Sequence, residues 1–314
     1  RTRSQRQAAA AKRAYQWIET APPDLPVDRA ILEIHRLMVT GCDDDHCEPG
    51  ALRKQDDNVT FGRPPHRGAE GGGEVARAFN GLTEAAASYF LESEPLLQGL
   101  ALHYHIAAMH PFQDGNGRCA RGVEAYFLRR AGYAIHGFIG LSNYYYEERV
   151  AYLRILAETR QREGNLTAFF VFGLKGIALQ CARIRNIILR ENKIVLFKNM
   201  MYRVYTKYET PRRRHINERQ IKILEFLLDQ IDGLSETNKL IDHLSPFYRG
   251  LKKEGHAFAR DLIDLEFLNA VQSNDDSDAI KLNLDWPQFM TDTELGQIIL
   301  ESPSTSKLPK IKPR

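Results

Sequence analysis

Twelve consecutive residues carry most of the side chains in this sequence that could do chemistry. They run from His110 to Arg121 and read HPFQDGNGRCAR. The segment combines a base, a carboxylate, two glycines, an amide and two arginines. Phosphate oxygens are bound by hydrogen-bond donors, positive charge and metal ions, and this segment offers groups for all three. It therefore predicts a site for a phosphorylated ligand.

The flanking sequence predicts how the segment is held. Residues 97–109 before it and 118–130 after it have the apolar pattern of helices. The polar segment is then a loop that leads into a helix N-terminus, where unpaired amides and the positive end of the helix dipole bind anions. Gly115 and Gly117 can take a positive φ and let a ligand approach the backbone. We therefore expect an anion site at this junction.

The remaining side chains of the segment fit a nucleotide triphosphate with its metal ion. Asn116 is an amide donor, and Arg118 and Arg121 share one face of the predicted helix. Asp114 is an oxygen ligand suited to Mg²⁺, and His110 could take a proton from an attacking hydroxyl. Each group alone is more often structural, as a turn, a helix end or a solvated surface. Their convergence in one loop favours a functional site.

The segment resembles the signature of the Fic-domain family, His-Pro-Phe-x-Asp-Gly-Asn-Gly-Arg-x-x-Arg, with every fixed position present. The likeness continues more loosely over about residues 8–175. The resemblance implies a helical core that transfers AMP from ATP to a Ser, Thr or Tyr hydroxyl of a target protein, with Mg²⁺, releasing pyrophosphate. It also implies a role for each signature residue: His110 as general base, Asp114 as Mg²⁺ ligand, Asn116 with the amides of Gly115 and Gly117 on phosphate oxygens, Arg118 and Arg121 on the β- and γ-phosphates, and Phe112 as a buried anchor.

Two further segments are site candidates through the same resemblance. Val59, Thr60, Phe61 and Gly62, in the irregular stretch 42–73, resemble the β-hairpin flap that pairs by backbone with an extended segment of the target protein. A plain surface hairpin is the alternative. The family's nucleotide-base contacts fall near Tyr144 and Tyr145, so either ring is a candidate for adenine. Aromatic packing in the core is the alternative for both.

The fold class that we predict is mainly α: a helical Fic core with a short β-hairpin flap, plus a C-terminal winged-helix-like domain. The helical periodicity predicts an order of helices and a pair of strands. The helices span residues 6–19, 27–39, 74–92, 95–109, 118–130, 142–160 with Ser142 as N-cap, 166–208 as one helix or two, 218–230, 237–244 and 257–267, and the strands 269–272 and 279–283. The expected domains are N-terminal helices (1–48), the Fic core (49–180), a helical connector (181–210), the winged-helix-like domain (211–290) and a tail, disordered at its end (291–314).

The C-terminal unit suggests two interpretations. Three helices followed by a hairpin resemble a winged helix, whose third helix would enter the major groove of DNA. That helix, however, has Arg260 as its main basic residue and carries three acidic ones. Phosphate binding needs a basic face, so we favour a protein-interaction or dimer-support module over DNA binding.

Composition and charge indicate which classes of partner and which cellular compartment to expect. The chain of 314 residues is 43% hydrophobic and 26% charged, with a net charge of +3, which is too mild to indicate nucleic-acid binding. None of its stretches approaches the roughly 18 uncharged apolar residues of a membrane span. The four cysteines form no C-x-x-C pair and suit a reducing compartment, so we predict a cytoplasmic protein without membrane contact.

Regulation and alternative functions stay open at this level. Many Fic proteins carry an inhibitory segment, Ser/Thr-x-x-x-Glu-Gly/Asn, whose glutamate pairs with the second signature arginine. It is not found before the first helix of this chain; residues 159–164 match it literally but lie where core helices join. We expect a protein substrate on the flap. The sequence leaves the oligomeric state open, although helical Fic proteins often pair as homodimers. The alternatives to AMP transfer are removal of AMP, transfer from another nucleotide donor, and a DNA-binding regulator with a Fic sensor core.

Overall fold

The protein consists of two compact units, Arg1–Arg185 and Asn186–Arg314, and each is described by itself. The structure is a computed structural model. It describes residues 2–62, 65–90, 92–133, 141–162, 164–207, 209–210, 213–214, 216–230, 235–274 and 279–286. The expected tail after residue 290 lies outside these ranges.

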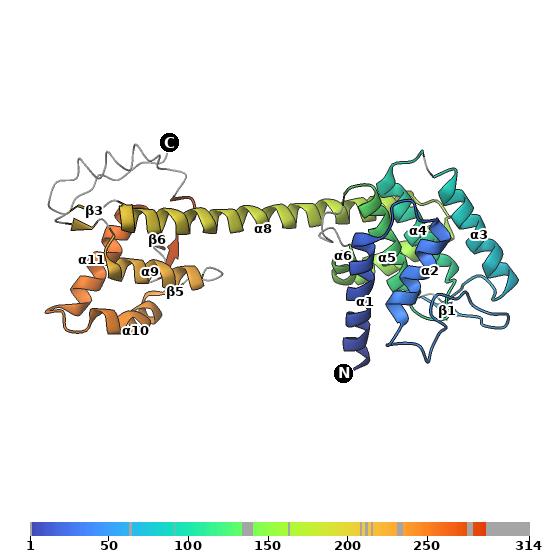
Figure 1. Cartoon of the computed structure of the whole chain (residues 1–314), viewed down its shortest axis with the longest axis horizontal. Coiled ribbons are helices and arrows are strands. Elements are labelled where there is room, and N and C mark those ends of the chain that lie inside the picture. Colours follow the sequence, from blue (N-terminus) through green and yellow to red (C-terminus); the bar gives the residue numbers. More distant parts are fainter. Residues whose placement is uncertain are drawn as a thin grey trace. The chain divides into compact units, whose positions relative to one another are not determined.

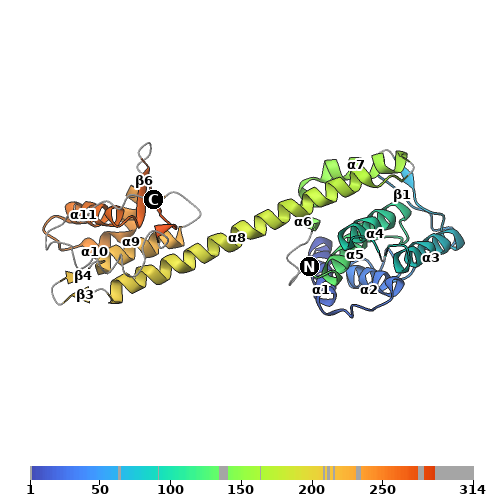
Figure 2. The ribbon, with the colours of Figure 1, turned by 90° about the horizontal axis from the view of Figure 1, so that it is seen from above.

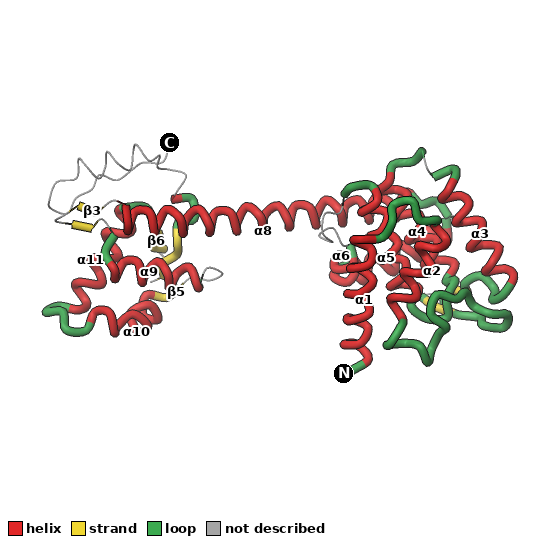
Figure 3. Tube along the Cα trace, viewed as in Figure 1, coloured by secondary structure: helices red, strands yellow, loops and turns green. Residues whose placement is uncertain are grey.

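Within its described ranges the first unit is helical apart from loops and one two-stranded hairpin (Figures 1 and 3). Its elements are α1 (Arg3–Thr20), α2 (Val27–Val39), β1 (Thr60–Phe61), β2 (His66–Arg67), α3 (Gly73–Ala87), α4 (Pro95–Met109), α5 (Asn116–Arg130), α6 (Ser142–Glu147), α7 (Arg149–Gln161) and the first part of α8 (Thr167–Lys207). The hairpin pairs Thr60 with Arg67 and Phe61 with His66 in antiparallel register. The predicted flap is thus a hairpin.

Helices α4 and α5 form the centre of this unit and lie against one another (Figure 2). Helix α4 is apolar around most of its circumference, as is expected of a helix that is covered on all sides. Helix α5 is also mostly buried, although it carries polar and charged residues. Helices α1 and α2 pack against α5, and α3 packs against α4. The loop between α4 and α5, which carries the signature, therefore emerges from the most constrained part of the fold.

The beginning of α8 packs closely on α4 through a glycine. A Cβ added to Gly173 would lie 2.4 Å from a methyl carbon of Leu100, which is fully buried. Real Cβ atoms do not approach other atoms so closely, so the helices can touch here only without a side chain. Tyr144 of α6 makes a similar contact with Gly176, one helical turn further along α8.

The second unit contains the rest of α8, three further helices and short strands. They are β3 (Glu209–Thr210), β4 (Arg213–Arg214), α9 (Glu218–Asp229), β5 (Ser235–Glu236), α10 (Thr237–Tyr248), α11 (Glu254–Phe267), β6 (Val271–Asn274) and β7 (Ala279–Leu282). The last sheet is antiparallel with strand order β5-β7-β6. The core is built around Trp286 and Phe197, both fully buried. The element order agrees with the predicted three helices and hairpin, and the winged-helix assignment and DNA binding stay predictions.

The structure corrects the predicted helix 142–160 and decides between one helix and two for residues 166–208. The helix expected from Ser142 to residue 160 is two helices, because the backbone leaves helical geometry at Glu148. Ser142 is the first residue of α6 and not its cap, and its hydroxyl hydrogen-bonds Tyr15 instead. The stretch 166–208, left as one helix or two, is the single helix α8.

Helix α8 also bears on the expectation of no membrane span. Over Thr167–Thr206 it is long and apolar enough to cross a membrane, by length and composition only, and 22% of its most apolar window is buried. Lys175 and Arg183 lie in its first half. One such helix is weak evidence, so the predicted absence of membrane contact remains a prediction.

Two glycine-to-alanine substitutions should have opposite effects on stability. In Gly173→Ala the new methyl group meets Leu100, so we expect the free energy of unfolding to fall by about 1–3 kcal/mol. Gly81 in α3 has nothing within 4 Å of an added Cβ, so Gly81→Ala should raise it by up to about 1 kcal/mol. Urea unfolding of both variants measures the difference. Equal effects of the two substitutions would contradict the close contact between α8 and α4.

Candidate functional site

The signature forms the expected loop between two helices. Helix α4 ends at Met109, and His110 takes a left-handed conformation with φ of 50°. Helix α5 begins at Asn116 after Gly115, whose φ is 77°. A Cβ on Gly115 would also lie 2.6 Å from a methyl group of Val39, so only glycine fits there. The free amides at the start of α5 thus lie in the predicted place.

Asn116 fixes this loop from inside. Its side chain is buried and bonds both polar groups of Phe112: Oδ1 accepts from the backbone amide at 2.9 Å, and Nδ2 donates to the carbonyl at 2.7 Å. Both halves of the amide are therefore engaged in this structure, and the expectation that this side chain holds phosphate oxygens stays a prediction. Phe112 is fully buried, as predicted for an anchor.

His35, which the sequence analysis did not identify, supports the loop from α2. Its ring stacks on Phe112 with centroids 3.6 Å apart. The amide of Gly50 donates to Nδ1 at 3.0 Å, so Nε2 carries the proton and donates to the carbonyl of Asp114 at 3.0 Å. Burial lowers the pKa of His35 to about 4, which keeps this neutral tautomer.

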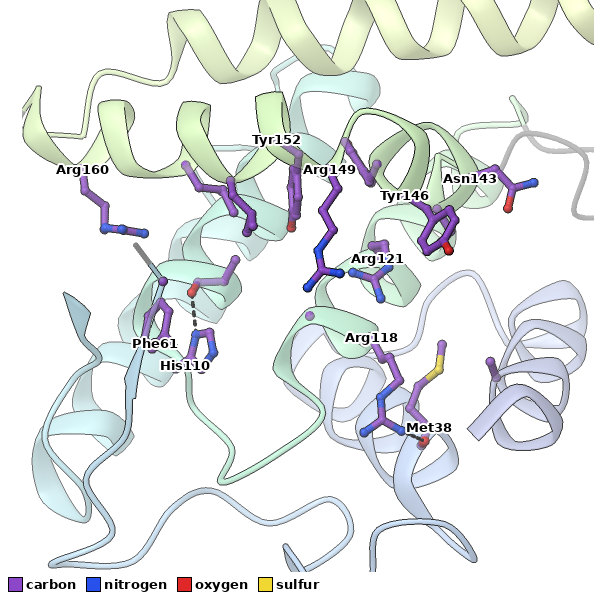
Figure 4. Close-up of a pocket in the computed structure, with 18 of the residues that line it drawn as sticks. Met38, Phe61, His110, Arg118, Arg121, Asn143, Tyr146, Arg149, Tyr152 and Arg160 are labelled. Carbon is purple, nitrogen blue, oxygen red and sulfur yellow. Dashed lines mark hydrogen bonds between the residues drawn. The ribbon is translucent and has the colours of Figure 1, made fainter. Parts of the chain in front are cut away.

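His110 lies where a general base is needed. Its Nδ1 donates to the carbonyl of Ala107 at 2.6 Å, which leaves Nε2 as the nitrogen that can accept a proton. Burial lowers the pKa of His110 to about 4, and the charges of Arg53 and Arg160 add to this effect. The ring of Phe61, from β1, stacks on the imidazole at a centroid distance of 3.4 Å (Figure 4). The flap thus touches the candidate base directly.

Arg53 joins the flap segment to the signature. Its guanidinium is buried and donates to the carbonyls of His110 at 2.7 Å, Ala69 at 2.5 Å and Asp57. Its amide donates to the carbonyl of Pro111 at 3.0 Å. These contacts hold the chain on both sides of the flap hairpin, at residues 53–57 and at Ala69, against the loop that carries His110.

Asp114 is paired with basic residues. Arg3, at the start of α1, contacts its carboxylate at 2.9 Å, and Arg118 lies 3.7 Å away. Both arginines also bind the buried Asp43, at 2.7 and 2.6 Å. Burial alone would raise the pKa of Asp43, but hydrogen bonds from Gln7, these arginines and Cys42 outweigh it and hold that pKa well below its usual range. Neither Arg3 nor Asp43 was identified from the sequence.

A cavity of about 660 Å³ opens beside His110, between the flap, α5 and α7. Among the residues that the structure describes, four arginines line it, Arg118, Arg121, Arg149 and Arg160, and no acidic residue does. An adjoining hollow of about 540 Å³ lies over the signature loop, and its lining includes Asp114, Gly115, Gly117 and the flap residues Val59, Thr60 and Phe61. The flap residue Gly62 lines the larger cavity. The site is therefore suited to an anion with several charges.

The two candidate tyrosines lie differently. Tyr144 is buried against α8 and is not among the residues that line the cavity, so its position favours the core-packing alternative. Tyr145 lines the cavity, but it is buried and donates to Glu124 at 2.8 Å. Asn143 and Tyr146 also line the cavity and were not predicted as site residues (Figure 4). The side chain of Tyr146 is 79% exposed.

A buried chain of hydrogen bonds begins at Tyr152, which lines the cavity. Burial raises the pKa of the Tyr152 hydroxyl to about 12, and the positive charge of Arg121 opposes this effect. That hydroxyl lies 2.9 Å from Nε2 of His103, whose Nδ1 lies 2.5 Å from the carboxylate of Glu124. His103 is fully buried. The chain connects Tyr152 to the core between α4 and α5.

The residues that could hold a metal ion are few. The structure has no cluster of three or more histidine, cysteine or acidic side chains arranged as metal ligands within its described ranges. Mg²⁺ often binds through one carboxylate together with the phosphates of a substrate, and Asp114 suits that mode. Its side chain is 38% exposed and lines the hollow over the loop.

Comparison with known proteins agrees with this architecture. Residues 26–128 match the Fic/DOC family model. A protein adenylyltransferase Fic from Culex quinquefasciatus is 33% identical over 106 residues, which are 33% of this chain and 19% of that protein. The chain thus spans about a fifth of the length of this curated relative.

Solved structures of Fic proteins are similar in fold. A Fic family protein from Desulfovibrio desulfuricans G20 has a TM-score of 0.51 at 18% identity, over 90% of this chain and 76% of that one. This likeness shows the fold of a Fic protein, mainly helical as predicted. A fragment of Fic-1 from C. elegans has a TM-score of 0.48 at 20% identity, over 60% of this chain and 54% of that one.

Glu124 should be important for stability. Glu124→Ala would leave His103 and Tyr145 buried without their shared partner, so we expect the free energy of unfolding to fall by about 3–5 kcal/mol. Glu124→Gln keeps an acceptor and most of the volume and should cost clearly less. Chemical denaturation of both variants provides the comparison. If alanine and glutamine cost the same, the hydrogen bonds of the carboxylate do not stabilise the core.

The titration of His110 should be displaced to low pH. We expect an NMR midpoint near 4 rather than the ordinary 6.5, because burial disfavours the charged ring. Phe61→Ala should raise the midpoint because it uncovers the imidazole, whereas Thr60→Ala on the same strand should not. By linkage, the unfolded chain binds this proton more tightly, so stability is fully present above pH 6.5 and is lost as pH falls toward 4. A wild-type midpoint near 6.5 would refute the statement that burial lowers the pKa of His110.

Proposed function

We propose that this chain is a Fic/DOC family protein that transfers AMP from ATP, with Mg²⁺, to a Ser, Thr or Tyr hydroxyl of a target protein. The observation that carries the proposal is the placement of His110. A neutral imidazole with one free nitrogen lies at the edge of an arginine-lined cavity, next to the N-terminus of α5. The match of residues 26–128 to the family model and the name of the Culex relative support it.

The chemistry assigned to His110 is general-base catalysis. The target hydroxyl oxygen attacks the α-phosphorus of ATP, and its proton passes to Nε2. The bond from the α-phosphorus to the bridging oxygen of the β-phosphate breaks, and its electron pair leaves with pyrophosphate. Because the pKa of His110 lies near 4, the ring is neutral and ready to accept a proton at neutral pH.

The triphosphate would lie along the start of α5. The amide of Gly117 suits its oxygens, as an N-terminus with a positive dipole end does generally. The amide of Gly115 donates to Oδ1 of Asp114 at 2.5 Å, so it would bind phosphate only after releasing that carboxylate. Arg118 is held in place by Asp43 and by the carbonyl of Met38 at 2.9 Å, so its guanidinium is preorganised for phosphate. In the described part of the chain no ion pair engages Arg121, which leaves it available for the γ-phosphate.

Asp114 fits the proposed Mg²⁺ site as its one protein carboxylate. When bound, the ion neutralises charge on the phosphates and orients them for in-line attack. The carboxylate lines the hollow beside the amides of α5, so it could share an ion with a bound triphosphate. Arg3 now contacts one of its oxygens at 2.9 Å, and an ion would compete with that contact.

The flap would hold the target protein. Residues 59–62 line the cavities on the side of His110, and β1 is only two residues long and pairs with β2 alone. An extended target segment could add to this edge by main-chain bonds, which provide affinity without reading much sequence. The side chain of Thr60 is exposed beside that edge.

Label transfer tests the proposed function. The protein and its His110→Ala variant are incubated with Mg²⁺, cell lysate and ATP labelled at the α- or the γ-phosphate. We expect protein labelling from the α-position only, and a loss of about 100-fold or more in the variant because the base is removed. His46→Ala, an exposed histidine on the loop after α2, serves as the control and should label normally.

Two results would contradict AMP transfer. Label from the γ-position would indicate phosphoryl transfer, and equal labelling by the His110→Ala variant would remove His110 from the reaction. A chain that labels only with another nucleotide, or that removes AMP from a labelled protein, would support the corresponding alternative at the same site.

A further inference from the structure

Arg149, outside the signature, points into the same cavity as the two signature arginines. It is the first residue of α7, and its exposed side chain lines the cavity. Arg121 of α5 lines the same cavity, and both guanidinium groups point toward the middle of the site (Figure 4). Two helices, α5 and α7, therefore direct positive groups into one cavity.

The charges near this pair are not balanced by acidic side chains. Arg118 has Asp43 at 2.6 Å and Asp114 at 3.7 Å. Across the residues that the structure describes, Arg121 and Arg149 take part in no ion pair, and the cavity lining contains no carboxylate. Glu147, at the end of the preceding helix, pairs with Arg183 at 2.7 Å.

A repulsion acts between positive charges that line one cavity without acidic partners. A bound anion with at least two charges would relieve it. Guanidinium groups bind phosphate in a bidentate manner, so a pair of them suits a terminal phosphate group.

We propose that Arg149 and Arg121 together form the binding site for the terminal phosphate of a nucleoside polyphosphate. The inference rests on the proposed function, in which that phosphate belongs to the leaving pyrophosphate. It adds a third arginine to the two of the signature. It also defines a specificity. A ligand with three phosphates reaches this pair of arginines, a monophosphate does not, and the triphosphate therefore binds more tightly.

The experiment measures binding without a target protein, by calorimetry. The probes are inorganic tripolyphosphate, a non-transferable ATP analogue with a methylene group between the α- and β-phosphates, and AMP. For Arg149→Ala we expect affinity for tripolyphosphate and for the analogue to fall by about tenfold or more, as for loss of a charged hydrogen bond. Affinity for AMP should change by less than about threefold. Arg149→Lys keeps the charge but loses the bidentate fork and should fall between the two.

Arg154→Ala is the matched control. Arg154 lies on the same helix, is exposed and pairs with Glu158 at 3.8 Å, and it is not among the residues that line the cavity. Its removal takes the same charge from α7. An equal loss of affinity in both variants would therefore mean that Arg149 acts only through the net charge of the helix and does not bind the phosphate directly. Tripolyphosphate affinity unchanged in Arg149→Ala, an equal loss for AMP, or no binding of tripolyphosphate to the wild-type protein would each overturn the proposal.

The test is separate from that of AMP transfer. If tripolyphosphate binding depends on Arg149 while the wild-type protein transfers no label, the anion site stands and the proposed reaction fails. If AMP is transferred but Arg149→Ala binds tripolyphosphate as the wild type does, the reaction stands and this inference fails.

Discussion

The two hydrogen bonds between the side chain of Asn116 and the peptide groups of Phe112 are the constraint on which the site depends. They close the loop between α4 and α5 into one shape. That shape sets the left-handed conformation of His110 and directs the first amides of α5 outward. Because both helices are buried around most of their surface, the loop cannot shift without disturbing the core. The reactive groups are therefore positioned by packing several residues away from them.

Buried polar side chains connect this loop to its surroundings. Arg53 brings the flap segment to His110, and His35 brings α2 to the carbonyl of Asp114. Removing a guanidinium from water is costly unless its donors are paired, and those of Arg53 are bonded to backbone carbonyls. The flap, α2 and the signature are thus joined by bonds that are expensive to break one at a time, which favours a single arrangement of the site.

Much of the framework could be predicted from local sequence, and the partners of the site could not. The signature loop, the bounds of α2 and the start of α4 at Pro95 follow from periodicity and from proline. The contact of Arg3 with Asp114 joins residues 111 positions apart, and no local pattern indicates it. Arg149 was missed because it was expected inside one continuous helix. The break at Glu148 makes it the first residue of α7, beside the cavity. The roles of the signature residues remain predictions.

The stack of Phe61 on His110 has a consequence for the moment of proton transfer. At rest the phenyl ring excludes water from one face of a neutral imidazole. Once the imidazole has accepted a proton, the same ring presents its electron-rich face to a cation, an attraction of about 0.5–2 kcal/mol that offsets part of the effect of burial on the pKa of His110. Arg160 already lies 5.9 Å from the centre of that ring. The hairpin that is proposed to hold the target would then also help to carry the charge that the reaction creates.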